Sequence, residues 1–353
     1  MNPYGFHHSI LSRTRIPIPP LGHDIIIARR LVFRQWGWYN WGMNILYCGD
    51  EGISGGVLVS ILSLIRNGQK RYDAKLGKMV KDKNVDVPEY NIYIMTICYG
   101  EMKPFKKKAV EFLDELAKKA NAKSFVKLID ATEVFTKNLP EKNMGSYFTL
   151  GAMLRLYMDR VPELAKLDRV LYLDYDVVCR GDISEFYNRD LDGIEAVGVL
   201  DIYGRRWYKY HGLFKRESDV REWADVADRP CSVLKQDYMN SGVMLFNMRE
   251  CEKTGMFAQA RKWCVTKRML LPDQGALNRA IARRKLVARK YNEQDERPRK
   301  DTVLHHFSNN FKFWPYFRVQ KVKPFEIDKV HEVLKITEYD DILSEYNELK
   351  DNL

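Results

Sequence analysis

Two aspartates, Asp174 and Asp176, stand one residue apart directly after the apolar segment RVLYL. A turn that follows a strand can bring both carboxylates toward one point, where they could share a cation. Hard oxygen ligands of this kind suit Mg²⁺ or Mn²⁺, with water and substrate phosphate filling the remaining positions. The alternative is a turn in which the carboxylates cap backbone amides. The position after an apolar strand favours the metal site.

A second segment, VLHHFSNNFKFW at 303–314, offers further ligands. A histidine beside two carboxylates makes a mixed oxygen and nitrogen site, which suits Mn²⁺ better than Mg²⁺ or Ca²⁺. We expect one of the two histidines to serve as a ligand and the other to be structural. Lys312 would supply a point charge for a phosphate.

The same aspartates also fit the Asp-x-Asp-x-Val nucleophile motif of phosphatases of the haloacid-dehalogenase type. There Asp174 would form an aspartyl-phosphate and Asp176 would act as acid and base. That fold usually begins with this motif, whereas here about 130 residues separate Met43 from it. Phe186 also stands where a second metal-binding aspartate would be expected. The phosphatase is therefore the second hypothesis.

The segments around these residues alternate between strand and helix patterns. Near-continuous apolar strands separated by amphipathic helices predict an α/β fold with a mostly parallel sheet covered on both faces. Ligands of such sheets bind at the carboxyl ends of the strands, where Asp50, Asp174 and Asp201 stand. The expected strands are 43–48, 90–98, 124–131, 169–178 and 194–202, and the expected helices are 57–67, 103–120 and 146–161, the last with Ser146 as N-cap.

Composition excludes several classes of protein. The six cysteines form no Cys-x-x-Cys pair, which argues against a disulfide scaffold or a zinc cluster. The sequence has no run of about 18 apolar residues, so no transmembrane helix is predicted. We expect residues 1–42 to be a poorly ordered N-terminal extension, 43–315 to be the α/β domain and 316–353 to be a helical C-terminal extension.

The net charge of +11 is unevenly spread, because residues 279–323 carry 13 Lys and Arg against 4 Asp and Glu. Such a stretch could belong to a non-catalytic basic module that binds nucleic acid or a membrane. Its aromatic residues lack an RNA-recognition signature, so no nucleic acid partner is expected. We expect a cytoplasmic protein, and a peripheral contact with the anionic inner face of the membrane stays open.

The motifs together resemble a known family. In order, they are NILYCGDEG, DRVLYLDYDVVCRGDISEFYNRDL, YMNSGVMLFNM, PDQGALN and HFSNNFKFW, between Met43 and Trp314. This order is similar to that of the family-8 retaining glycosyltransferases. The resemblance implies the nucleotide-sugar (GT-A) fold, a uridine-diphosphate sugar as donor and Mn²⁺ as cofactor, with Mg²⁺ as the second choice.

The resemblance also assigns roles to individual residues. It implies Asp174, Asp176 and His306 as metal ligands, with His305 structural. The catalytic and acceptor-side residues it implies are Asp201, Asp273 and Gln274. The donor-binding residues it implies are Cys48, Asp50, Arg155, Asp174, Tyr175, Asn240, Asn309 and Lys312. Three residues depart from the family pattern: Gly52, Asn309 and Phe313 stand where relatives often have Asn, Gly and Pro.

The sequence therefore predicts a metal-dependent hexosyltransferase that moves glucose or galactose from a UDP-sugar to a carbohydrate acceptor. Gln274 is a weak nucleophile, which favours front-face attack with retention over a covalent sugar intermediate. The aromatic segment 203–223 is the candidate acceptor-side lid. The sequence leaves the sugar, the acceptor and the linkage open.

Overall fold

The computed structural model describes residues 42–144, 150–201, 237–269, 271–308 and 322–353. Residues Gly42–Leu353 form one compact unit. The expected N-terminal extension lies outside the described residues except for Gly42. The expected boundary at 315/316 stays a prediction, although side chains from both sides of it share one hydrophobic core.

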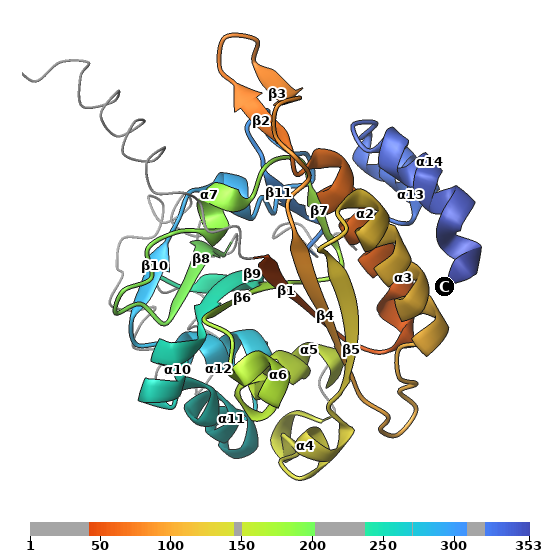
Figure 1. Ribbon diagram of the computed structural model, residues 1–353. Coiled ribbons are helices and arrows are strands. Elements are labelled where there is room, and N and C mark those ends of the chain that lie inside the picture. Colours follow the sequence, from red (N-terminus) through yellow and green to blue (C-terminus); the bar gives the residue numbers. More distant parts are fainter. Residues whose placement is uncertain (1–41, 145–149, 202–236, 270, 309–321) are drawn as a thin grey trace, which may run out of the picture. The chain divides into compact units, whose positions relative to one another are not determined.

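A seven-stranded sheet forms the centre of this unit, in the order β10-β8-β9-β6-β1-β4-β5 (Figure 1). Parallel pairs join β1 to β4 and β6, β4 to β5, and β8 to β10. Only β9 runs against its neighbours in this sheet, β6 and β8. The strands are β1 (Met43–Cys48), β4 (Tyr90–Thr96), β5 (Phe125–Asp130), β6 (Arg169–Leu173), β8 (Ala196–Leu200), β9 (Met239–Asn247) and β10 (Arg284–Leu286).

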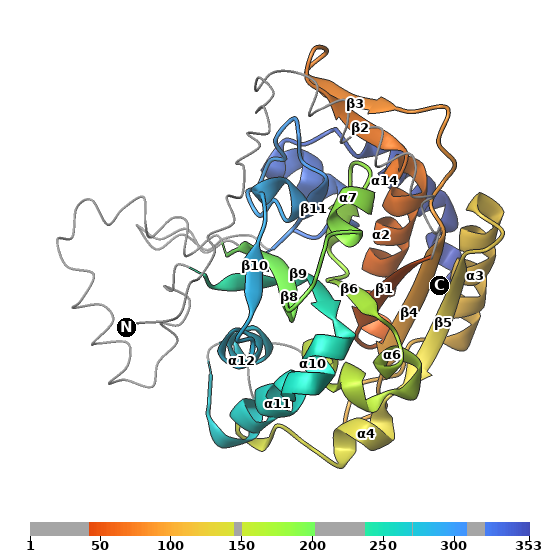
Figure 2. The ribbon, with the colours of Figure 1, turned by 60° about the vertical axis from the view of Figure 1, so that its left-hand side comes forward.

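Helices cover both faces of the sheet, as the continuous apolar strands require. On one face lie α2 (Ser54–Asn67) and α3 (Lys107–Ala120), together with the C-terminal helices (Figures 1 and 2). The other face carries η3 (Leu154–Arg160), α10 (Met248–Thr254), α11 (Met256–Thr266) and α12 (Pro272–Ala280). Further short helices are η1 (Glu51–Ile53), α4 (Thr132–Thr136), η2 (Glu141–Asn143), α6 (Pro162–Ala165), α7 (Ser184–Tyr187) and η6 (Arg289–Tyr291).

The helix expected over 146–161 takes a different form. It is a short α-helix, α5 (Leu150–Met153), followed by a 3₁₀-helix, η3 (Leu154–Arg160), and Ser146 lies outside the described residues. The Arg155 side chain offers a physical reason, because its Nε donates to the Ala152 carbonyl at 2.7 Å. In an α-helix that carbonyl would accept from the backbone amide of Leu156.

Two smaller antiparallel pairs extend the fold. β11 (Leu304–His306) pairs with β7 (Val177–Cys179), and β2 (Lys70–Asp73) pairs with β3 (Lys78–Lys81) in a hairpin. The C-terminal residues form α13 (Ile327–Lys329), the π-helical turn η7 (Val330–Leu334), α14 (Asp340–Leu349) and η8 (Lys350–Asn352). Among the described residues, no helix is both long and apolar enough to span a bilayer.

Candidate metal and donor site

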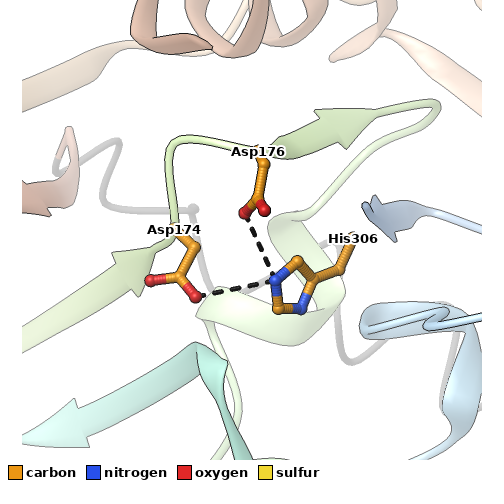
Figure 3. Close-up of side chains that lie close together, drawn as sticks. All are labelled: Asp174, Asp176 and His306. Carbon is orange, nitrogen blue, oxygen red and sulfur yellow. Dashed lines mark ion pairs between the residues drawn. The ribbon is translucent and has the colours of Figure 1, made fainter. Parts of the chain in front are cut away.

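Asp174 and Asp176 lie in the turn between β6 and β7, at the carboxyl end of β6. The backbone amide of Asp174 donates to the Gly242 carbonyl on β9 at 2.8 Å, and the Val177 amide donates to the Asp174 carbonyl at 3.1 Å. This turn directs both carboxylates toward His306 (Figure 3). The geometry thus differs from a simple capping turn, because the two side chains converge on a third group.

His306 completes the cluster from a distant part of the sequence. The pairing of β11 with β7 places His306 opposite Val177, next to Asp176. Its Nε2 lies 3.5 Å from Asp174 Oδ2 and 3.3 Å from Asp176 Oδ1. One ligand atom from each of the three residues lies within 4.8 Å of the others. A small cation placed among these atoms could bind all three side chains.

Several features of the cluster fit a divalent cation. Asp176 Oδ1 is buried and has no hydrogen-bond partner among the described residues, which is costly unless a cation binds it. His306 Nδ1 lies 3.2 Å from Asn292 Oδ1, an arrangement that directs Nε2 toward the carboxylates. A Cβ at Gly242 would lie 2.1 Å from His306 Cε1, so only glycine leaves room for the ring there. The mixture of oxygen and nitrogen ligands suits Mn²⁺ and also accepts Mg²⁺.

Lys323 also enters this site, and the sequence interpretation missed it. Its Nζ lies 2.5 Å from Asp176 Oδ2 and 5.2 Å from the centre of the Tyr175 ring. Burial tends to lower the pKa of Lys323, but Asp176, Tyr175 and Asp174 together outweigh it and the pKa is raised. A signal for this residue was present: relatives often have Pro at the position of Phe313, after Lys312, and this Lys-Pro-aromatic order occurs here at Lys323, Pro324 and Phe325.

Arg155 fixes the other aspartate of the pair. Its Nη2 donates to Asp174 Oδ1 at 2.9 Å and its Nη1 donates to the Ser241 carbonyl at 2.7 Å. Tyr172 donates a second hydrogen bond to Asp174 Oδ1 at 2.6 Å. Asp174 Oδ2 is left facing His306. Burial tends to lower the pKa of Arg155, but Asp174, Tyr172 and Asp273 together outweigh it and the pKa is raised, so the guanidinium stays charged.

Asp201, Asn240 and Gln274 form a neighbouring network of buried polar groups. Asp201 Oδ2 accepts from Asn240 Nδ2 at 3.0 Å and from Gln274 Nε2 at 3.2 Å. Gln274 Oε1 accepts from the Ser241 amide at 2.9 Å. Asn240 Oδ1 accepts from Asn292 Nδ2 at 2.9 Å. Asn292, which no motif in the sequence singled out, thus joins this network to His306.

Asp273 lies beside these residues. Its Oδ2 is 3.3 Å from Arg155 Nε. Burial raises the pKa of Asp273 in spite of the nearby guanidinium. The structure therefore brings Asp273 into contact with Arg155, and through Arg155 with the metal cluster.

The remaining predicted donor residues have varied positions. Cys48 lies at the end of β1, and burial raises the pKa of its thiol in spite of the influence of Arg155, so the thiol stays protonated. Tyr175 is half-buried beneath Lys323. Asp50 Oδ1 accepts from the Gly52 amide at 3.1 Å and caps the helix η1. Asn309, Lys312 and the segment 203–223 lie outside the described residues.

His305, next to the candidate ligand His306, contacts groups within the fold through both of its ring nitrogens. Its Nδ1 lies 2.7 Å from the Tyr339 hydroxyl and its Nε2 lies 2.9 Å from the Asp295 carbonyl. Burial lowers the pKa of His305 to about 3, so the ring is neutral. The contact to Tyr339 attaches β11 to the C-terminal residues that also carry Lys323.

Similar proteins of known activity are lipopolysaccharide 1,2-glucosyltransferases. One from Escherichia coli is 25% identical over 256 residues, which is 70% of this chain and 62% of that protein. Another, from Escherichia coli strain K12, is 25% identical over 238 residues, 67% of this chain and 57% of that protein. The chain therefore spans less than two thirds of the length of these relatives.

Solved structures show the same fold at low identity. The galactosyltransferase LgtC in complex with donor and acceptor sugar analogs matches with a TM-score of 0.57 and 15% identity, over 88% of this chain and 100% of that one. The bifunctional glycosyltransferase WbbM matches with a TM-score of 0.55 and 17% identity, over 88% of this chain and 52% of that one. These likenesses confirm the predicted α/β class, with a largely parallel central sheet flanked by helices as in GT-A proteins.

The model of one family, described as glycosyl transferase family 8, matches residues 44–317. This range is almost the same as the one over which the motifs resembled the family, from Met43 to Trp314. The match covers well over half of the chain. It favours the glycosyltransferase over the two alternatives, the phosphatase and the non-catalytic basic module. The chain belongs to glycosyl transferase family 8.

Proposed function

We propose that this chain is a metal-dependent, retaining glycosyltransferase that moves a hexose, glucose or galactose, from a UDP-sugar to a glycan acceptor. The observation that carries the proposal is the convergence of Asp174, Asp176 and His306, whose ligand atoms all lie within 4.8 Å of one another. Mn²⁺ is the proposed cofactor, with Mg²⁺ as the alternative. The names of the curated relatives point to a lipopolysaccharide-type acceptor. A cytoplasmic location stays a prediction.

The charged side chains of the site would bind and orient the donor diphosphate. When bound, a divalent cation would neutralise charge that develops on the leaving nucleoside diphosphate. Lys323 would add a fixed positive charge beside Asp176, and Arg155 would hold Asp174 in its orientation through the 2.9 Å contact. These groups are already bonded to one another, so little rearrangement is needed when the donor binds.

The hydrogen bonds of Gln274 support front-face attack by the acceptor. Its Oε1 already accepts from the Ser241 amide and its Nε2 donates to Asp201. An amide oxygen held in this way is a poor nucleophile. Gln274 would instead present its polar surface to the positive charge that develops on the sugar, and the acceptor proton would pass to a phosphate oxygen. Isolation of a sugar covalently attached to Gln274, Asp273 or Asp201 would contradict this route.

Hydrolysis and transfer assays with a panel of UDP-sugars test the proposal. The wild type is expected to release UDP from UDP-glucose or UDP-galactose when Mn²⁺ is present and to lose this activity with a chelator. Asp176→Asn keeps the size of the side chain but weakens the cation ligand, and we expect at least a 100-fold loss of kcat/KM. Asp168→Asn is the matched control, because Asp168 is 65% exposed and pairs with Arg249 on the surface.

Equal activity in wild type and Asp176→Asn would remove the metal assignment. UDP release that is unaffected by chelation in the wild type would remove it as well. Hydrolysis of phosphomonoesters without any UDP-sugar turnover would instead favour a phosphatase.

A further inference from the structure

The hairpin β2–β3 joins the unit at its base, and the partly buried Met79 side chain packs against the main hydrophobic core. The Asp182 amide donates to the Lys70 carbonyl at 2.7 Å, and Arg71 pairs with Asp182 at 3.0 Å. Beyond this anchor the two strands extend away from the sheet, and both views show the hairpin at the margin of the unit (Figures 1 and 2). Gly77, with a φ of +62°, closes the turn at the tip.

The hairpin exposes apolar side chains to an unusual degree. Tyr72, Leu76 and Val80 are 40%, 61% and 36% exposed, and Leu76 stands at the tip. They make up half of the six large exposed hydrophobic residues in the described part of the chain. The cost of exposing them to water suggests that another surface covers them.

The same hairpin is strongly basic. Residues 70–83 carry six Lys and Arg against two Asp. Both aspartates accept hydrogen bonds from nearby backbone amides, Asp73 from Lys75 and Leu76 and Asp82 from Asn84. Within the described residues, Lys75, Lys78 and Lys81 are exposed and have no ion pair. Their charges are therefore free to meet an anionic surface.

We propose that the β2–β3 hairpin docks the protein on the surface of an anionic phospholipid bilayer. Leu76 and Tyr72 would enter the boundary between headgroups and acyl chains, and the lysines would lie among the lipid phosphates. Tyrosine is well suited to this boundary because its ring is apolar and its hydroxyl stays hydrated. This surface differs from the basic stretch 279–323, and it needs no part of the donor chemistry.

The combination of charge and apolar exposure selects the bilayer over other occupants. An acidic polymer such as a nucleic acid would use the lysines but leave Leu76 in water. A second copy of this chain would bring an equally basic hairpin against this one, which like charges oppose. An anionic bilayer offers phosphates to the lysines and an apolar interior to Leu76.

Co-sedimentation of the full chain with vesicles tests the proposal. We expect binding to phosphatidylglycerol–phosphatidylcholine vesicles, weak binding to phosphatidylcholine alone, and a decrease as salt is raised. Each lysine near such a surface contributes roughly a fivefold factor in affinity. The triple variant Lys75→Gln, Lys78→Gln, Lys81→Gln should therefore bind about 100-fold more weakly. The matched control, with the same loss of charge on another surface, is Lys108→Gln, Lys119→Gln, Lys123→Gln.

A tryptophan at the tip reports whether the apolar residues enter the bilayer. In anionic vesicles, lipids brominated on their acyl chains should quench the tryptophan fluorescence of Leu76→Trp. The quenching should be stronger than that of the wild type in the same vesicles. UDP release from the donor in solution should be unchanged in the hairpin variants, so failure of docking and failure of the proposed activity are distinguishable.

Three results would overturn the proposal. Equal loss of vesicle binding in the hairpin triple variant and its control would show a general charge effect. Binding without quenching of the new tryptophan, together with an equal affinity for an oligonucleotide, would show a polyanion contact. A dimer in sedimentation velocity that Leu76→Ser disrupts would show that a second copy covers the hairpin.

Discussion

Replacement of Lys323 by methionine removes the positive charge that balances the Asp176 carboxylate in this site. Methionine keeps an unbranched side chain of similar length and removes the ammonium. In the structure this ammonium contacts Asp176 Oδ2, while Asp176 Oδ1 faces His306 Nε2 at 3.3 Å. The variant should therefore weaken the fold without metal and strengthen the binding of a divalent cation.

The magnitudes follow from the contacts. At a separation of about 5 Å and an effective dielectric constant of about 20, a divalent cation and the ammonium would repel each other by about 7 kcal/mol. The Lys323 side chain is 18% exposed, so water screens part of this. We expect Mn²⁺ to bind roughly 10- to 100-fold more tightly to Lys323→Met. Loss of the ion pair should lower the stability of the metal-free protein by about 2 kcal/mol, less than for a fully buried pair.

Isothermal titration with Mn²⁺ and urea unfolding in chelator measure the two effects. Lys329→Met is the matched control, because Lys329 is 52% exposed and its pair with Glu326 should contribute about 0.5 kcal/mol or less. Unchanged or weaker Mn²⁺ binding in Lys323→Met, with no loss of stability, would refute the electrostatic reasoning. If Lys323 also binds the donor diphosphate, UDP affinity in the presence of Mn²⁺ should fall even though Mn²⁺ affinity rises.

Three further changes probe the surroundings of the site. Gly242→Ala should keep the circular dichroism spectrum but weaken Mn²⁺ binding at least tenfold in titration calorimetry, because the new Cβ would displace the His306 ring. Tyr339→Phe removes the hydroxyl bonded to His305 Nδ1 and should lower stability by about 1–3 kcal/mol in urea unfolding; an unchanged midpoint would contradict a structural role for this contact. Arg155→Lys keeps the charge but cannot make all three guanidinium contacts, and it should lower the thermal midpoint and kcat/KM together.

The sequence predicted the parallel part of the sheet well. The strands β1, β4, β5, β6 and β8 all fall within the expected segments, because buried apolar runs separated by amphipathic helices leave few other arrangements. Strand β9 was not predicted as a strand, although its motif was singled out. Its antiparallel direction depends on pairing with β6 and β8, which is not encoded in any local pattern.

The site was predictable where its residues belong to short motifs. Asp174 and Asp176 follow a strand, and a turn there could be expected to bring them together. His306 lies 130 residues after Asp176, and its approach depends on the pairing of β11 with β7. Lys323 and Asn292 were missed, because the sequence interpretation assigned the lysine role to Lys312 and no motif includes the asparagine. Long-range contacts of this kind follow from the fold and not from spacing.

The charge balance of the metal cluster gives the C-terminal residues a function. Two carboxylates close together repel each other, and this repulsion must be offset before a cation arrives. Arg155 on η3 and Tyr172 on β6 bind one carboxylate, whereas Lys323 binds the other from beyond residue 321. Tyr339, through His305, attaches the same C-terminal residues to the strand that carries His306. The C-terminal residues therefore supply both a charge and an anchor to the cluster, so changes in them should alter metal binding as well as stability.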